Sequence, residues 1–169
     1  MRINGTPGLA CDALLQSLGS RIRLEPLSKF RVVEDLIVDR SVMMENLKAL
    51  SLWIDGKAVW QKKTEARAFE ASRCLQCGLC LEVCPNFSAE GLFAGAAGAV
   101  PFSRKLIQDP EWNRAASQAY RTRVFEGCGK SLACSRVCPA EIDIEQLMSR
   151  SNGAALWRSL RRSGSGRRK

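Results

Sequence analysis

The amino-terminal part of the chain and the remainder differ in how their apolar residues are spaced. Within residues 21–39, apolar positions stand beside charged ones and include the β-branched runs Val32–Val33 and Ile37–Val38, a pattern that favours extended strands. From Arg40 the period changes. Apolar residues then recur every three or four positions, which predicts a helix ending at Asp55–Gly56; its apolar positions are Met43, Met44, Leu47, Leu50 and Ile54.

Further helices are predicted on both sides of the middle of the chain. One is expected to begin near Thr64, a suitable N-cap, and to lead into Cys74. Asp143 can cap a last helix, whose apolar face is predicted to carry Ile144, Leu147, Met148 and Ser151. The pattern therefore predicts a partly extended segment over 1–39, followed by a mainly α domain over 40–157.

Small residues and prolines interrupt the helical pattern between these two ends. The stretch 91–100 is rich in Gly and Ala, and Pro101 and Pro110 are expected to separate it from a helix that runs from Trp112 toward Val124. Tryptophans are predicted to anchor the core or an interface; they are Trp53, Trp60, Trp112 and Trp157.

The composition permits a folded core and excludes a membrane span. Hydrophobic residues make up 46% of the 169 residues, and the longest weakly polar stretch, 91–102, falls short of the roughly 20 residues that a span requires. The net charge is +9, and part of the excess lies in the Gly/Ser-rich segment 158–169, which is predicted to be a disordered tail. Docking of this tail on anionic lipid or on an acidic partner is the alternative. No nucleic acid is expected as a partner, because the tail lacks interleaved aromatic residues.

Four cysteines lie close together in the pattern Cys74-x2-Cys77-x2-Cys80-x3-Cys84, followed by Pro85. This spacing is typical of the bacterial iron–sulfur run, in which three thiolates hold one cluster and the fourth ligates the second cluster of a pair. The spacing therefore predicts a partner run elsewhere in the chain.

The partner run is Cys128-x5-Cys134-x3-Cys138-Pro139. It aligns with the first run at every cysteine except Cys77, where Ser131 stands. With cross-ligation between the runs, cluster one would be held by Cys74, Cys77, Cys80 and Cys138, and cluster two by Cys84, Cys128 and Cys134.

Three thiolates leave one iron of a cubane without a protein ligand, which favours a [3Fe-4S] cluster at the second position. The alternative is that the Ser131 oxygen or a water holds a fourth iron; thiolate is the better ligand for this chemistry. Structural zinc is disfavoured because the chain has no histidine and zinc sites usually use two Cys-x2-4-Cys pairs. A disulfide framework is disfavoured because it requires an oxidising compartment, and no signal peptide with a basic stretch and an apolar core is visible in the sequence.

The chain resembles the iron–sulfur subunit of succinate dehydrogenase and fumarate reductase. The matching residues are the two cysteine runs, Glu25-Pro26-Leu27, Val33, Asp35–Asp39, Phe93–Ala97, and the opening from Asn4-Gly5 through Leu9–Cys11. The resemblance implies a mainly α fold: an α-helical dicluster ferredoxin-like domain preceded by a short remnant of a plant-type ferredoxin (β-grasp) domain. In that family the second run also lacks one cysteine and holds a [3Fe-4S] cluster.

The resemblance also bears on Cys11, which by itself reads as a small buried core residue. In the family, a preceding domain holds a [2Fe-2S] cluster on four cysteines, and Cys11 looks like the last of them. The other three would lie upstream of Met1. The preferred interpretation is a truncated product or a start site placed too late, and a first half encoded separately is the alternative. The [2Fe-2S] cluster is expected only if the missing ligands are supplied.

The implied function is that of a non-catalytic electron-transfer subunit of a succinate:quinone oxidoreductase-type complex. Its partners would be an FAD flavoprotein subunit, membrane anchor subunits and a quinone, on the cytoplasmic inner face of the cell membrane. Pro85 matches the family's quinone region. The tryptophan and histidine that the family often places nearby are absent, because the corresponding residues are Asn86–Ala89 and Gly129.

Two other classes of protein remain open. Dicluster subunits that resemble heterodisulfide reductase or anaerobic glycerol-3-phosphate dehydrogenase contain the same paired runs, but they normally keep the cysteine that is Ser131 here. A non-redox module that binds zinc and nucleic acid is motivated by the net charge of +9.

Overall fold

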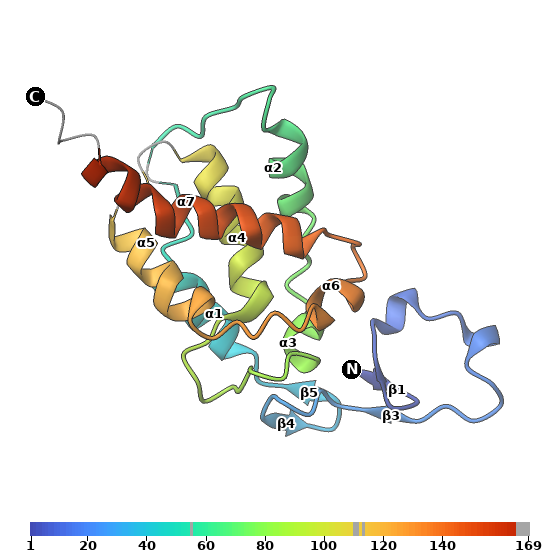
Figure 1. The fold of residues 1–169 in the computed structure, drawn as a ribbon. Helices are drawn as coiled ribbons and strands as arrows, with labels where there is room; N and C mark the ends of the chain where they lie inside the picture. Colours follow the sequence, from blue (N-terminus) through green and yellow to red (C-terminus); the bar gives the residue numbers. More distant parts are fainter. Residues whose placement is uncertain (55, 110–111, 113, 165–169) are drawn as a thin grey trace, which may run out of the picture.

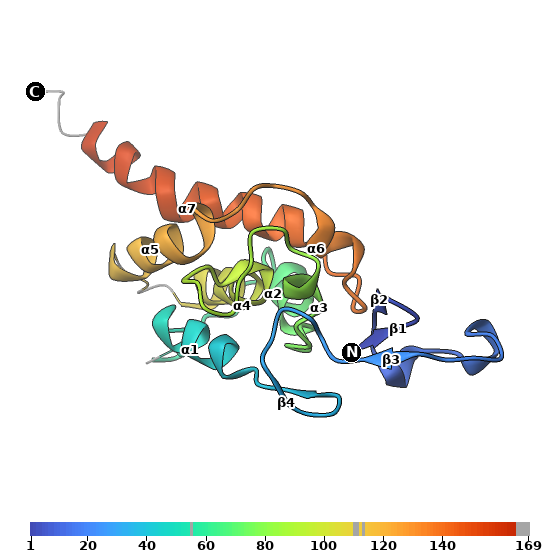
Figure 2. The ribbon, with the colours of Figure 1, turned by 90° about the horizontal axis from the view of Figure 1, so that it is seen from below.

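The computed structural model describes residues 1–54, 56–109, 112 and 114–164. A helical body makes up most of the molecule, and a strand-bearing amino-terminal segment extends beside it (Figures 1 and 2). The strands are β1 (Arg2–Ile3), β2 (Thr6–Pro7), β3 (Leu24–Glu25), β4 (Val32–Glu34) and β5 (Ile37–Val38). β1 pairs antiparallel with β2 and β3, and β4 pairs with β5 in a separate hairpin. The extended character predicted for 21–39 is therefore present as short strands.

The helical body is arranged around α4, which contacts α1, α2, α3 and α7. In Figure 1, α7 crosses in front of α4. The α-helices are α1 (Ser41–Ala49), α2 (Glu65–Ser72), α3 (Leu79–Glu82), α4 (Gly95–Gln108), α5 (Arg114–Tyr120), α6 (Ala133–Arg136) and α7 (Ile144–Gly164). Short 3-10 turns, η1 (Ala10–Asp12) and η2 (Leu15–Ser17), connect the amino-terminal strands.

The main core lies between α4, α5 and α7. Phe102 and Tyr120 are fully buried, and their rings stack with centroids 4.5 Å apart. Asp143 caps α7 as predicted, since its Oδ1 accepts the backbone N–H of Gln146 at 2.9 Å. The predicted apolar face of α7 is also confirmed, because its residues are buried; they are Ile144, Leu147, Met148 and Ser151.

A second apolar cluster ties the amino-terminal segment to the first cysteine run. Leu27 and Phe30 are buried in it. Beside them, the buried Glu82 carboxylate accepts hydrogen bonds from Ser28 N at 2.9 Å, Ser28 Oγ at 2.6 Å and Lys29 N at 3.1 Å. Burial alone would raise the pKa of Glu82, but these hydrogen bonds outweigh it and hold the pKa below its ordinary value. Glu82 is therefore a charged clamp between the two parts of the molecule.

The prediction that Pro101 ends the small-residue stretch is wrong, because α4 continues through Pro101 to Gln108. Proline has no N–H to donate to the carbonyl four residues earlier, which is Ala97 O. That carbonyl accepts a hydrogen bond from the Gln76 side chain instead, at 2.9 Å. The helix tolerates Pro101 because a residue distant in sequence satisfies the carbonyl that it frees. Pro110 lies outside the described residues.

The helix predicted to end at Asp55–Gly56 is shorter than expected. α1 ends at Ala49, and Ser51 has a left-handed backbone (φ 50°) that turns the chain away before Ile54. Of the two roles predicted for the tryptophans, in the core or at an interface, the structure contradicts the first for three of them, because the side chains of Trp53, Trp60 and Trp157 are exposed. A core role is thus excluded for these tryptophans.

The carboxy-terminal helix is longer than expected. α7 continues through Gly164 and so extends into the basic segment 158–169. Good helix formers such as Ala, Leu and Arg follow Gly153 as far as Arg162, and no proline lies within α7. None of the helices in the described part of the chain combines the length and apolar character that a bilayer span requires.

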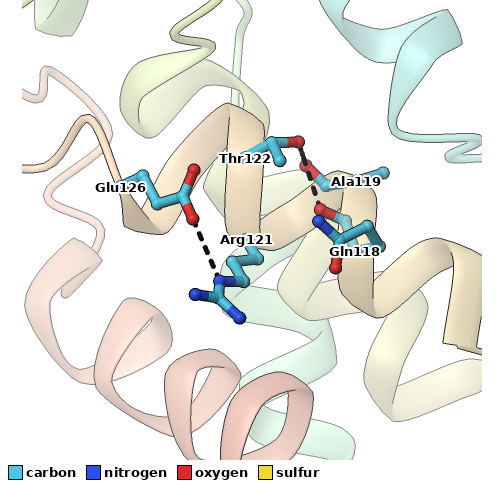
Figure 3. A network of polar contacts seen from close by, with 5 residues as sticks. All are labelled: Gln118, Ala119, Arg121, Thr122 and Glu126. Carbon is cyan, nitrogen blue, oxygen red and sulfur yellow. Dashed lines mark hydrogen bonds and ion pairs between the residues drawn. The ribbon is translucent and has the colours of Figure 1, made fainter.

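The helix predicted from Trp112 toward Val124 is present as α5 followed by a π-helical turn, η3 (Arg121–Phe125). Figure 3 shows the polar contacts around this junction: Arg121 Nε donates to Glu126 Oε1 at 3.0 Å, and Thr122 Oγ1 donates to Gln118 O at 3.1 Å. Such π turns are frequent beside functional sites. This one leads directly into the second cysteine run.

Candidate functional site

The first cysteine run occupies the loop between α2 and α3. Two residues of this loop, Gln76 (φ 51°) and Gly78 (φ 84°), have left-handed backbones that bend it back on itself. A Cβ on Gly78 would lie 3.4 Å from Phe30 Cζ, so glycine suits both the conformation and the close packing. The loop then enters α3, which carries Cys80 and places Cys84 just after its end.

The second run repeats this backbone conformation. Lys130 (φ 54°) and Leu132 (φ 58°) have left-handed backbones at the positions that align with Gln76 and Gly78. α6 then begins at the position that aligns with the start of α3. Ser135 N donates to Leu132 O at 3.2 Å, as Leu81 N donates to Gly78 O at 3.0 Å. The internal repeat found in the sequence is thus also a repeat in three dimensions, and it is preserved although Ser131 replaces a cysteine.

Four of the cysteines line one cavity. They are Cys74, Cys77 and Cys80 of the first run and Cys138 of the second. Gln76, Gly78, Ala96 and Ala97 line the same cavity, so much of its wall is made of small residues and loop backbone. These four cysteines are the set that cross-ligation predicts for cluster one.

A second cavity is lined by the remaining cysteines of the two runs, Cys84, Cys128 and Cys134. Ser131 lines it too, together with side chains of α7. Its volume is about 340 Å³, against about 30 Å³ for the four-cysteine cavity. These cysteines are the set predicted for cluster two, and the larger volume reflects space between the second run and α7.

The two cavities lie side by side. Ala96 of α4 and Ile144 of α7 line both of them. α4 and α7 also contact each other directly. Groups bound in the two cavities would therefore be separated by a thin apolar layer, and both would lie within the helical body.

Three of the thiols, those of Cys74, Cys80 and Cys134, sit in surroundings that oppose their ionisation in the absence of a cation. Burial raises the pKa of Cys80, and the charges of neighbouring thiolates, first Cys74 and Cys77, raise it further. Burial also raises the pKa of Cys74 and of Cys134; backbone and side-chain hydrogen bonds from Gln76 partly offset this effect at Cys74. Metal ligation requires thiolates, so iron in the cavities would supply the compensating positive charge.

The chemistry of the donors in the two cavities suits an iron–sulfur cluster. Within the described part of the chain, no three Cys, Asp or Glu side chains approach closely enough to share one metal ion. A lone zinc ion requires its sulfurs about 2.3 Å away. Soft thiolates around a cavity, with small residues close by, are the donor set for an iron–sulfur cluster.

Sequence reasoning missed two polar residues behind the second cavity. Tyr120 Oη donates to Asn152 Oδ1 at 2.8 Å, and Asn152 lines that cavity. Burial raises the pKa of Tyr120, with a smaller contribution from the nearby Cys128 thiolate. No local pattern points to this pair, because α5 and α7 bring it together only in the folded chain.

The two remaining predicted site residues have different surroundings. Pro85 lines the second cavity beside Cys84. Cys11 lies in η1 and is exposed, so the interpretation of Cys11 as a buried core residue is wrong. Cys11 also lines neither of the two cysteine cavities.

Both parts of the chain match families of iron–sulfur proteins. Residues 1–45 match the family described as a 2Fe-2S iron-sulfur cluster binding domain, and residues 70–142 match the 4Fe-4S dicluster domain. The second match contains both cysteine runs. The iron–sulfur nature predicted for the cofactors is thereby confirmed at the level of the family.

The chain is similar to the iron–sulfur subunits of succinate dehydrogenase and fumarate reductase, as the sequence predicts. It is 35% identical to the succinate dehydrogenase subunit of Bacillus subtilis over 158 residues, which cover 85% of this chain and 61% of that protein. It is 30% identical to the fumarate reductase subunit of Haemophilus influenzae, covering 85% of this chain and 64% of that protein. The chain thus spans less than two thirds of these relatives.

A solved structure has the same fold. The Mycobacterium smegmatis Sdh1 complex in the apo form contains a chain that superposes with a TM-score of 0.71 and 22% sequence identity, over 90% of this chain and 71% of that one. The helical body and the short amino-terminal strands are therefore an arrangement already seen in an experimental structure.

Proposed function

We propose that the chain is an iron–sulfur electron-transfer subunit of a complex like succinate dehydrogenase or fumarate reductase. What supports this most is the division of the clustered cysteines into two neighbouring cavities, one with four thiols and one with three. Bound clusters supply one-electron redox chemistry. The thin wall of Ala96 and Ile144 between the cavities suits transfer of an electron from one to the other.

The protein's contribution on this proposal is to hold the clusters and to exclude water from them. Cys74, Cys77, Cys80 and Cys138 would hold a [4Fe-4S] cluster, and Cys84, Cys128 and Cys134 a [3Fe-4S] cluster. The small side chains of Ala96 and Ala97 let backbone approach the first site closely. No acid or base needs to act in this chain, since only electrons move through it.

The rest of the complex is proposed from the similarity. The partners would be an FAD flavoprotein, a membrane anchor and a quinone, with the chain peripheral on the cytoplasmic face of the membrane. Pro85, beside Cys84 in the second cavity, would lie on the quinone side. Cys11 would ligate a [2Fe-2S] cluster in the ferredoxin-type part if further ligands are supplied, and its exposure leaves it accessible to them.

Metal and sulfide analysis of the anaerobically purified chain tests this function. The ligand count predicts one [4Fe-4S] and one [3Fe-4S] cluster. The expected result is therefore roughly seven irons and eight acid-labile sulfides per chain. Zinc without sulfide would contradict the redox function. It would support the alternative of a structural zinc module.

A second candidate function is that of a dicluster carrier for a different electron acceptor. The observation that favours it concerns Asn86 and Gly129, which line the second cavity where the family often has a tryptophan nearby and a histidine. Asn86 Nδ2 donates to Gly127 O at 2.8 Å. A Cβ on Gly129 would lie 2.9 Å from the same Nδ2, so the Asn86 amide is held closely against the loop that contains these two glycines. Assays with a quinone and with a soluble dye acceptor distinguish the two: reduction of the dye but not of the quinone favours this alternative.

A further inference from the structure

The Gln76 side chain connects the first cysteine cavity to the helix that forms its wall. Its Nε2 donates to Cys74 Sγ at 3.2 Å and to Ala97 O at 2.9 Å. Gln76 also lines the four-cysteine cavity. One amide group therefore contacts both a cluster thiol and the backbone of α4.

The Ala97 carbonyl is available to Gln76 because of Pro101. In an uninterrupted helix, the N–H of residue 101 would donate to the carbonyl of residue 97. Proline has no N–H, and leaving a buried carbonyl unsatisfied would cost about 1–3 kcal/mol. The Gln76 amide fills this vacancy. Pro101 thus determines where the amide of Gln76 is held.

The same carbonyl determines which end of the amide faces the thiol. If the amide were flipped, Oε1 would lie against Ala97 O, and two acceptors would face each other. The orientation with Nε2 toward Ala97 O and Cys74 Sγ is therefore the stable one. Oε1 is buried without a hydrogen-bond partner. The unpaired Oε1 carries a free-energy cost, and the same orientation directs the N–H donors of the amide to the sulfur.

We propose that Gln76 is a positioning residue that raises the reduction potential of the first cluster, and that Pro101 and Ala97 hold it in place. This inference rests on the proposed electron-transfer function. A hydrogen bond to a ligand sulfur withdraws negative charge from the cluster and stabilises the reduced state, which carries one more electron. The equivalent position in the second run is Lys130, which is exposed, so this interaction distinguishes the two sites.

The direct test is Gln76→Met, which keeps an unbranched side chain of similar length and removes the donor. We expect redox titration followed by electron paramagnetic resonance to show a lower potential for the first cluster and an unchanged potential for the second. Loss of one hydrogen bond changes the reduction equilibrium by up to about tenfold, which is 59 mV for a one-electron couple. Gln118→Met, the same change at an exposed site on α5, should leave both potentials unchanged.

Pro101→Ala tests the positioning. The restored N–H competes with Gln76 for Ala97 O, so the potential should fall in the same direction as for Gln76→Met, and by less. In the unaltered protein, glutamine labelled with ¹⁵N in its side chain should give a hyperfine coupling to the reduced first cluster, which Gln76→Met abolishes. An unchanged potential in Gln76→Met, or no ¹⁵N coupling in the unaltered protein, overturns the inference. Absence of iron and sulfide from the unaltered protein overturns the proposed function instead.

Discussion

Ser131 occupies the position in the second run that a cysteine occupies in the first. It lines the three-cysteine cavity, and the left-handed residues on either side of it match those of the first run. The backbone is therefore already arranged to present a side chain there. A single oxygen in place of sulfur accounts for the difference between the four thiolates proposed for the first site and the three proposed for the second.

Ser131→Cys is expected to convert the second cluster from three irons to four, because a fourth thiolate would then line its cavity. Iron content should rise by about one atom per chain, and the paramagnetic signal of the oxidised protein should disappear. Ser131→Ala is the matched control and should leave that signal unchanged. If Ser131→Ala removes an iron, the serine oxygen itself was a ligand.

Cys138 allows the cross-ligation to be tested residue by residue. It belongs to the second run but lines the cavity of the first-run cysteines. Cys138→Ala is therefore expected to damage the first cluster and to spare the second, as judged by their separate paramagnetic signals. Cys84→Ala should do the reverse. Should each variant lose the cluster of its own run, the ligand assignment is wrong.

The elements that hold the site were only partly predictable. The last helix and its Asp143 cap follow from local pattern, and so does the start of α2 after Thr64. The passage of α4 through Pro101 does not, since the carbonyl that it frees is satisfied by Gln76, which is distant in sequence. The Glu82 clamp likewise depends on a long-range contact with Ser28 and Lys29.

Glu82→Gln is expected to lower the thermal unfolding midpoint at pH 7, because it removes a charged acceptor of three hydrogen bonds. The expected decrease in the free energy of unfolding is about 2 kcal/mol. Since the folded pKa of Glu82 is lowered, its contribution is fully present above the unfolded value of about 4.3 and is lost as the pH falls through the folded value.

The difference in thermal unfolding midpoint between Glu82→Gln and the unaltered protein should therefore become smaller as the pH is lowered through the folded pKa of Glu82. Glu90→Gln, at an exposed position, is the matched control and should have little effect at any pH. A difference between Glu82→Gln and the unaltered protein that stays constant with pH would show that the charge of Glu82 is not what stabilises the contact.

At the scale of the whole molecule, the cysteine spacing predicted most of the site, because a rigid inorganic cluster imposes its ligand spacing over a few residues. The grouping of Cys138 with the first run needed the internal repeat as well. The positions of Trp53, Trp60 and Trp157 could not be predicted, since their hydrophobicity is the same whether they face a core or solvent. The lining of the second cavity by α7 also depends on tertiary packing.

On the proposed ligand sets, this molecule holds one four-iron and one three-iron cluster in adjacent cavities. Electron paramagnetic resonance of the anaerobically purified chain, before and after reduction with dithionite, tests this assignment most directly. We expect a signal in the oxidised sample, from the [3Fe-4S] cluster, that is replaced on reduction by the signal of a [4Fe-4S] cluster. A silent oxidised sample that gives two interacting signals after reduction would contradict it and would indicate two four-iron clusters.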